Sequence, residues 1–213
     1  MADSPPANRN VARGLATREH LVSVATQLFA EYGFEDTSIE QVLRTAKVSR
    51  GALYHHFASK EALFEAVLEA VGDAVGRRAL QATAGATDPY AVLRIACLAW
   101  IQIAGEPVVR RIMLIDAPAV LGWHRWRAME EQSTLGQIRA VLAAMADAGH
   151  LPPSLVDMFA HVVLASVNEI ALVIAASEDT NAATQAGSAA VDEFLERLLK
   201  PRPTRRRPGL VKW

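Results

Sequence analysis

The chain has 213 residues, 51% of them hydrophobic, which is enough apolar material for one domain or two small ones. Its single cysteine, Cys97, excludes an internal disulfide framework. The sequence contains no run of about 20 uninterrupted apolar residues, so we expect no membrane span. The N-terminus lacks the apolar core of a secretion signal, so we expect a cytoplasmic protein.

The net charge of −1 conceals an uneven distribution along the chain. Residues 1–60 carry a net +1, residues 61–196 a net −9 and residues 197–213 a net +7. An acidic middle would repel the phosphates of a nucleic acid, so any DNA contact has to come from one of the two ends. Composition therefore neither supports nor excludes DNA as a partner.

The N-terminal third of the chain predicts a disordered arm followed by four helices. Residues 1–14 are polar and contain two prolines, which is typical of a disordered arm. Gly33 is expected to end the first helix, and the fourth helix is expected to run past Arg78 and link two domains. Residues that favour the N-cap position precede the four helices: Thr17, Ser38 (with Thr37), Ser49 and Ser59.

Beyond Gly85 the apolar residues keep a helical spacing to about Leu199, with short loops and no strand-like alternation. We therefore predict an all-α fold in which a three-helix head, residues 15–60, joins through a linking helix to a larger bundle, residues 61–200. The basic, proline-rich residues 201–213 are predicted to form a disordered tail.

The order of short helix, tight turn and second short helix over residues 37–57 is that of a helix-turn-helix. The second helix of such a unit needs polar groups for the DNA groove and an apolar underside. Val48, Leu53 and Phe57 supply the underside. Tyr54 and Lys60 suit phosphate oxygens, because one carries a phenol and the other begins a helix. The polar groups are those of Ser49, Arg50, Gly51, His55 and His56.

This pattern resembles the tetracycline-repressor-like (TetR/AcrR) family of bacterial transcriptional regulators. One position departs from the family pattern, since Lys47 stands in the turn where glycine is usual. A lysine there carries backbone strain, changes the turn or adds a phosphate contact. The matching positions span about a quarter of the chain: Ala25, Phe29, Gly33, Thr37, Ser38, Ile39, Ala46, Val48, Ser49, Gly51, Leu53, Tyr54, Phe57, Lys60, Glu61 and Leu63.

The resemblance implies base contacts from Arg50, Gly51 and His55, with Ser49 beside them and Arg50 as the reader of guanine. For Phe57 we favour packing within the head over contact with DNA, whereas for Tyr54 we favour DNA. No metal site is expected, because the adjacent histidines point apart on a helix. The implied phosphate contacts come from Thr17, Thr37, Ser38, Tyr54, His56 and Lys60.

The resemblance also assigns residues 61–200 to effector binding and dimerisation. The last two long helices would form a homodimer interface, so that two heads read inverted half-sites of double-stranded DNA. We expect Glu169 to be a buried carboxylate that pairs within the dimer or with a ligand. For the tryptophans we favour a place in the core or an interface over a role in the pocket. Candidate pocket residues for an unnamed small molecule are Trp100, Met113, Trp123, His124, Trp126, His161, Asn168 and Glu169.

The expected function is thus a ligand-released repressor without a cofactor, and two alternatives stay open. A small all-α enzyme would need a catalytic constellation, but the sequence contains no HExxH, G-x-S-x-G or phosphate-binding glycine loop. Cys97 lies in an apolar run and is expected to be a buried, inert thiol. The arginines at 205–207 could instead bind any DNA, although we expect them to add only a modest electrostatic contribution.

Overall fold

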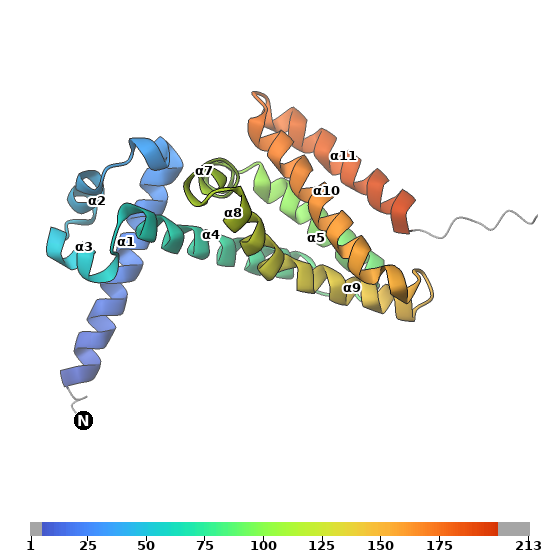
Figure 1. Cartoon of the computed structure of the whole chain (residues 1–213), viewed down its shortest axis with the longest axis horizontal. Helices are drawn as coiled ribbons and strands as arrows, with labels where there is room; N and C mark the ends of the chain where they lie inside the picture. Colours follow the sequence, from blue (N-terminus) through green and yellow to red (C-terminus); the bar gives the residue numbers. More distant parts are fainter. Residues whose placement is uncertain (1–5, 200–213) are drawn as a thin grey trace, which may run out of the picture.

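The computed structural model describes residues 6–199, and every regular element in this part of the chain is a helix. Figure 1 shows a small head at one end, a long helix, α4, that leads away from it, and a helical bundle at the other end. The predicted all-α fold with a helix-turn-helix head is confirmed.

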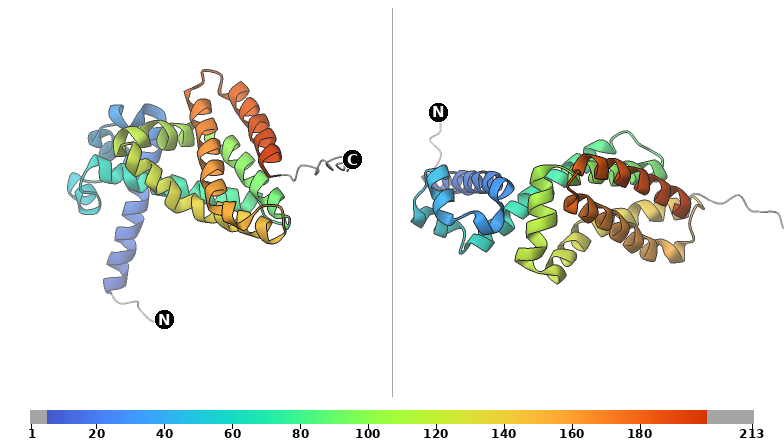
Figure 2. Two further views of the ribbon diagram at one scale, coloured as in Figure 1. Left: turned by 45° about the vertical axis from the view of Figure 1, so that its right-hand side comes forward. Right: turned by 90° about the horizontal axis from the view of Figure 1, so that it is seen from above.

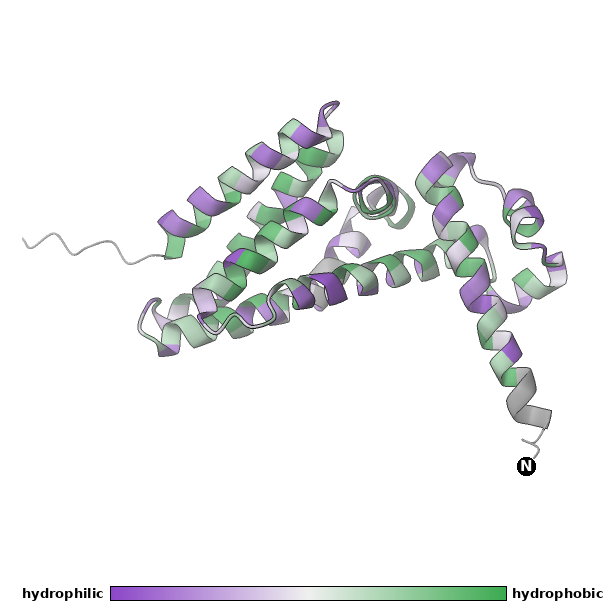
Figure 3. Ribbon diagram, turned by 180° about the vertical axis from the view of Figure 1, so that it is seen from behind, coloured by the Kyte–Doolittle hydropathy of each residue, from purple (hydrophilic) through white to green (hydrophobic). Residues whose placement is uncertain are grey.

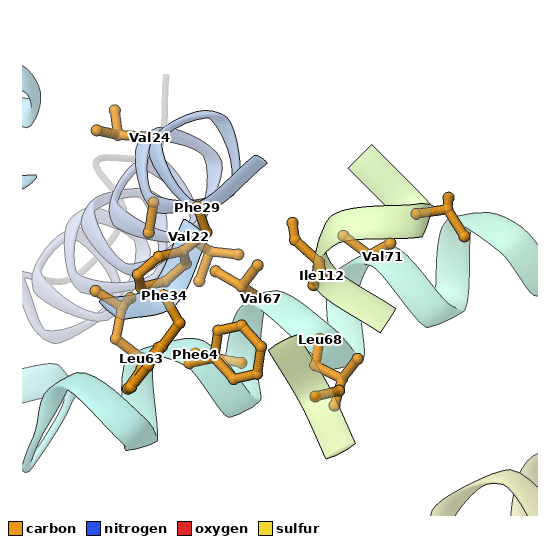
Figure 4. Packing of buried hydrophobic residues seen from close by; sticks show 14 of the residues in the cluster. Val22, Val24, Phe29, Phe34, Leu63, Phe64, Val67, Leu68, Val71 and Ile112 are labelled. Carbon is orange, nitrogen blue, oxygen red and sulfur yellow. The ribbon is translucent and has the colours of Figure 1, made fainter. Parts of the chain in front are cut away.

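The head consists of three helices, and α4 continues from it into the bundle. Their apolar faces meet in a core that includes Leu21, Phe29 and Phe64, which are fully buried. Figure 4 shows side chains of α1 and α4 packed together with Ile112 from the bundle, so one apolar cluster joins the two parts. The bounds are α1 Pro6–Asp36, α2 Ile39–Ala46, α3 Arg50–His56 and α4 Lys60–Ala82.

The bundle is built from the remaining helices, with α5 and α10 in contact with each other and with both α9 and α11. Figure 2 shows α10 and α11 side by side on one flank of the molecule. The bounds are α5 Pro89–Ala104, α6 Pro107–Val109, η1 Arg110–Asp116, α7 Ala117–Leu121, α8 Trp123–Glu130, η2 Glu131–Leu135, α9 Gly136–Asp147, η3 Pro153–Leu155, α10 Val156–Ala176 and α11 Thr180–Leu199. Of the short elements, η1 and η2 are π-helical and η3 is a 3₁₀-helix.

Three of the four predicted N-caps are confirmed. The Ser38, Ser49 and Ser59 hydroxyls each accept a hydrogen bond from the backbone N–H three residues later, at 3.2 Å. Ser38 also forms a reciprocal capping box, because the Gln41 side chain accepts from the Ser38 backbone N–H at 2.7 Å. Each cap satisfies a donor that the first turn of a helix would leave unpaired, which fixes where α2, α3 and α4 begin.

The prediction for the N-terminal arm is wrong in part, because α1 already begins at Pro6. Proline is well tolerated in the first turn of a helix, and the alanines, arginines and Leu15 that follow are good helix formers. Thr17 is therefore not an N-cap; its hydroxyl donates to the Arg13 carbonyl one turn earlier at 2.9 Å. Residues 1–5 of the expected arm and the predicted tail, 201–213, lie outside the described residues.

The segment Pro153–Ala176 is long and apolar enough to cross a membrane by length and composition alone, contrary to the sequence expectation. The core helices of folded domains can have the same length and apolar composition. In the structure its apolar side chains, among them Val163, Leu164 and Ile174, pack into the bundle. Figure 3 shows the apolar character of α10 against the more polar α11.

Cys97 lies in the second apolar cluster, on α5. Burial raises the pKa of its thiol to about 12, because the thiolate would lose its hydration there. We expect a thiol-reactive dye at pH 8 to label the folded protein far more slowly than the protein unfolded in guanidinium. Rapid labelling of the folded chain would contradict the inert role.

The same shift predicts a dependence of stability on pH. An unfolded cysteine has a pKa of about 8.5, so the native state keeps a proton that the unfolded state loses. The contribution of the buried thiol to the free energy of unfolding is complete below the unfolded pKa and is lost as the pH rises toward the native pKa of about 12. Equilibrium unfolding from pH 8 to 10 should therefore show a steeper loss of stability in the wild type than in Cys97→Ala.

Candidate nucleic-acid interface

The helix α3 presents a polar face to solvent and an apolar face to the head. Leu53 is fully buried and Phe57, which follows the helix, is nearly so. Residues one turn apart share a helix face, so fixing Leu53 inward turns the opposite side outward. That exposed side carries four of the predicted DNA contacts: Arg50, Gly51, Tyr54 and His55.

Gly51 has no side chain, and the space beside its backbone is open. A β-carbon built at this position would meet no atom within 4 Å. Beside it, the Arg50 guanidinium forms an ion pair with Glu40 of α2, and both side chains are largely exposed. A hydrogen bond from its own backbone N–H lowers the pKa of Glu40, and the charge of Arg50 acts in the same direction. The carboxylate is therefore ionised at neutral pH and holds Arg50 across the two helices.

Three of the predicted phosphate contacts, Ser38, His56 and Lys60, lie at the ends of helices around this face. The Lys60 ammonium lies 4.2 Å from the centre of the Phe34 ring and donates to the Glu35 carbonyl at 3.2 Å. Lys60 begins α4, where exposed N–H groups and the helix dipole favour an anion. Tyr54 and Ser38 are exposed and His56 is half-buried. These positions remain predictions of DNA contact.

The extended α1 passes close to α3. A β-carbon at Gly14 would lie 3.9 Å from the His56 ring, and the Arg18 guanidinium lies 5.4 Å from the centre of the Phe57 ring. Thr17 is half-buried on this stretch of α1. The contacts of Arg18 with Phe57 and of Glu40 with Arg50 were not predicted from the sequence. Nothing in the local sequence pattern shows which residues of separate helices meet.

Thr37 does not fit its predicted role. Its side chain is 1% exposed, and its hydroxyl donates to the Gly33 carbonyl at 2.7 Å. The prediction that this hydroxyl binds phosphate is wrong, because it is committed to the link between α1 and α2. Ser38, the next residue, is the exposed cap.

The turn residue Lys47 adopts the left-handed conformation, with φ 55° and ψ 40°. It follows α2 as the C-cap, and its backbone N–H donates to the Leu43 carbonyl. Of the three alternatives for this position, backbone strain thus applies, since a β-carbon is unfavourable in this conformation. The ammonium is exposed, and its contact with phosphate remains a prediction.

Of four predicted effector contacts in the bundle, Trp126 and Asn168 are buried, and Trp100 and Met113 are half-buried. The Trp126 indole N–H donates to the Met113 carbonyl at 3.1 Å, which gives both residues a structural contact. Asn168 is buried on α10. The Trp100 indole nitrogen is buried and has no hydrogen-bond partner within the described part of the chain. Such a donor is costly to leave unpaired, so Trp100 marks the strongest candidate contact for a ligand.

The other predicted effector contacts are more exposed. Trp123 and His124 face solvent, with the Trp123 ring tilted against Trp126, and His161 is half-buried. The expectation of a buried Glu169 is wrong for the single chain, because this residue is exposed. Adjacent residues differ by about 100° around a helix, and packing turns Asn168 rather than Glu169 inward.

Two family profiles match this chain. The first, described as "Bacterial regulatory proteins, tetR family", matches residues 21–67. The second, described as "Tetracyclin repressor-like, C-terminal domain", matches residues 90–198, which is more than half of the 213 residues. The chain belongs to the tetR family of bacterial regulatory proteins.

Solved and curated relatives agree with this assignment. A tetR-family transcriptional regulator from Pectobacterium atrosepticum superimposes with a TM-score of 0.78 at 32% identity, covering 90% of this chain and 98% of that one. The A-factor receptor protein of Streptomyces griseus is 47% identical over 57 residues, which are 27% of this chain and 21% of that protein. The transcriptional repressor NemR of Escherichia coli is 45% identical over 52 residues, 24% of this chain and 26% of NemR. The chain thus spans about a quarter or less of these two curated relatives.

The left-handed turn of this tetR-family head predicts a stabilising substitution. Replacing Lys47 by glycine removes the steric cost of the β-carbon, offset in part by the greater freedom of glycine in the unfolded chain. We expect Lys47→Gly to raise the free energy of unfolding by up to about 1 kcal/mol in urea titrations. Lys47→Ala keeps the β-carbon and should give no gain; equal gains in both variants would argue against strain.

Proposed function

We propose that this protein is a transcriptional repressor that binds an inverted-repeat DNA operator as a homodimer and is released by a small molecule. The observation that carries this proposal is α3, whose polar N-terminal face is exposed while Leu53 and Phe57 hold its underside in the head. This is the arrangement that places a recognition helix in a major groove. Repression is supported by the name of the relative NemR, a transcriptional repressor.

Arg50 is the proposed reader of guanine. Its fork of N–H donors matches the O6 and N7 acceptors of that base, and its present partner Glu40 is an exposed carboxylate. Exposed ion pairs are worth little, so exchanging Glu40 for a guanine costs little. Lys60, in contrast, is proposed to contact phosphate, which every sequence offers.

Substitution of these two residues should separate base reading from phosphate binding. We expect Arg50→Ala to cost about 1–3 kcal/mol of operator affinity and to relax the preference at one base position. Lys60→Ala should weaken binding to all sequences alike and reduce the salt dependence. The operator is first selected from random DNA with the full chain, and affinities are then measured by fluorescence anisotropy at two salt concentrations.

Two controls define what would contradict this assignment. Arg50→Lys keeps the charge but loses the fork, so it should behave like Arg50→Ala at the guanine position. A chain that lacks residues 201–213 should keep its sequence preference. Loss of all binding on this deletion would instead support non-specific binding through the basic tail.

Dimerisation is proposed to use α10 and α11. Along α10 an exposed apolar stripe repeats with helical spacing, and Met158 and Val173 on it are 63% and 60% exposed. Contiguous apolar surface of this kind is typical of an interface. The exposed Glu169 lies on the same face, two turns from Val162, where a partner subunit could supply its hydrogen-bond donor.

A charge on this stripe should prevent dimerisation. We expect Val173→Asp to shift the protein from dimer to monomer in sedimentation velocity, because an unpaired carboxylate is costly to bury. Operator affinity should fall with it, while circular dichroism stays helical. Leu80→Asp is the matched control: Leu80 is 74% exposed on α4, outside the proposed interface, so the dimer should persist. An unchanged dimer in Val173→Asp would place the interface elsewhere.

The effector is proposed to bind within the bundle, near Trp100 on α5. The unpaired indole N–H supports this location, since a ligand acceptor would satisfy it. The helix α5 contacts α10, which carries the buried Asn168, and α10 contacts η1, which carries Met113. The name of the relative from Streptomyces griseus, a receptor, is consistent with small-molecule binding.

A further inference from the structure

The helix α1 is broken at Gly33, and this break leaves a backbone donor for the bundle to bind. Gly33 has φ 85° and ψ 171°, so the helical hydrogen-bond pattern stops there. The Phe34 N–H, which is buried, donates instead to the Asp116 carboxylate of η1 at 2.8 Å. Asp116 is 82 residues away in the sequence and only 7% exposed. The head therefore depends on a side chain of the bundle for one of its buried hydrogen bonds.

Arg111 holds this carboxylate in place. Its Nε lies 3.2 Å and 3.3 Å from the two Asp116 oxygens. Residues five apart diverge by about 140° around an α-helix and by much less around a π-helix, so the π-helical form of η1 brings the pair closer together. The Arg111 guanidinium lies directly against Gly33, where a β-carbon would come within 1.7 Å of Nη2.

The head side of this contact leads to the DNA-binding elements. The Thr37 hydroxyl donates to the Gly33 carbonyl, and Thr37 precedes the cap of α2. The ring of Phe34 lies under the Lys60 ammonium at the start of α4. Figure 4 shows Phe34 packed with Phe29 and Phe64. The three ring centres are 5.1–5.7 Å apart. Movement at Gly33 would thus displace α2 and the start of α4.

The bundle side leads to the proposed effector and dimer elements. The Arg110 Nε donates to the Ala175 carbonyl, near the end of α10, at 2.6 Å. The Met113 carbonyl accepts from the Trp126 indole of α8. One π-helical segment of seven residues therefore contacts the head, α8 and α10.

We propose that Asp116 and Arg111 are positioning residues that fix the orientation of the head on the bundle, and with it the half-site spacing that the dimer accepts. This inference rests on the proposed function, because half-site spacing has meaning only for a dimer that reads an inverted repeat. Without the carboxylate, the head keeps its own core but loses the directional hydrogen bond that sets its angle.

The test uses the whole 213-residue chain and a DNA library. Two inverted copies of the selected half-site are separated by spacers of varied length, and the affinity is measured for each spacer. The wild type should prefer a narrow range of spacings. Asp116→Ala should bind a broader range with the same half-site sequence. Asp116→Asn keeps an oxygen that can accept from the Phe34 N–H and should restore much of the narrow range.

The matched control removes a different carboxylate that pairs with an arginine. Glu106, which precedes α6, accepts from Arg78 of α4 at 2.8 Å, outside the proposed dimer helices α10 and α11. Glu106→Ala should keep the wild-type spacing preference. A general loss of stability would instead weaken binding at all spacings alike, which a positioning role does not predict.

Hydrogen exchange of the Phe34 amide gives a readout that needs no DNA. We expect exchange to be faster by about tenfold in Asp116→Ala, with the core amides of α4 unchanged. If Asp116→Ala does not fold, Arg111→Gln, which frees the carboxylate but leaves the acceptor, should also broaden the spacing range. An unchanged range in that variant would overturn the inference.

The outcomes separate the two proposals. A wild type that selects a narrow spacing, with Asp116→Ala selecting the same one, would overturn the positioning role alone. A wild type that selects no inverted repeat would overturn the proposed function and this inference with it. A broadened range in Asp116→Ala, narrow again in Asp116→Asn, is the result that supports both.

Discussion

Gly33 ends the regular part of α1 in a conformation, φ 85° and ψ 171°, that a residue with a side chain rarely adopts. The chain turns there toward α2, and the turn brings the ring of Phe34 against Phe29 and Phe64 in the core that joins α1 to α4. Its carbonyl accepts from Thr37, and the N–H that follows it is bound by Asp116. The shape of the head and its attachment to the bundle thus depend on one break in one helix.

The recognition helix illustrates how a small head holds a polar surface ready without burying it. The apolar side chains of Leu53 and Phe57 fix its rotation, so the positions of the exposed groups follow from packing rather than from their own contacts. Arg50 is held by Glu40 but remains exposed. A weak, exposed ion pair keeps the Arg50 guanidinium oriented, and the guanidinium can still leave Glu40 for another partner at little cost.

In the bundle, α10 has two apolar faces. One packs into the core of its own chain through residues such as Val163 and Ile174, and the other, with Met158 and Val173, is exposed. A helix with both faces apolar satisfies the composition of a membrane span, yet it equally fits a helix shared by two subunits. The proposed dimer face and the η1 segment are linked through Arg110, so changes at the interface and at the head share a physical connection.

The sequence alone determined the starts of α2, α3 and α4, through the caps at Ser38, Ser49 and Ser59, and the inward side of α3, because these depend on interactions within a few residues. It also indicated that Lys47 is unusual in its turn. The tertiary structure decided the Glu40–Arg50 pair, the burial of Thr37, the inward turn of Asn168 instead of Glu169, and the Asp116–Phe34 hydrogen bond. The reason is geometric: adjacent residues differ by about 100° around a helix, and only packing against distant elements sets which one faces inward.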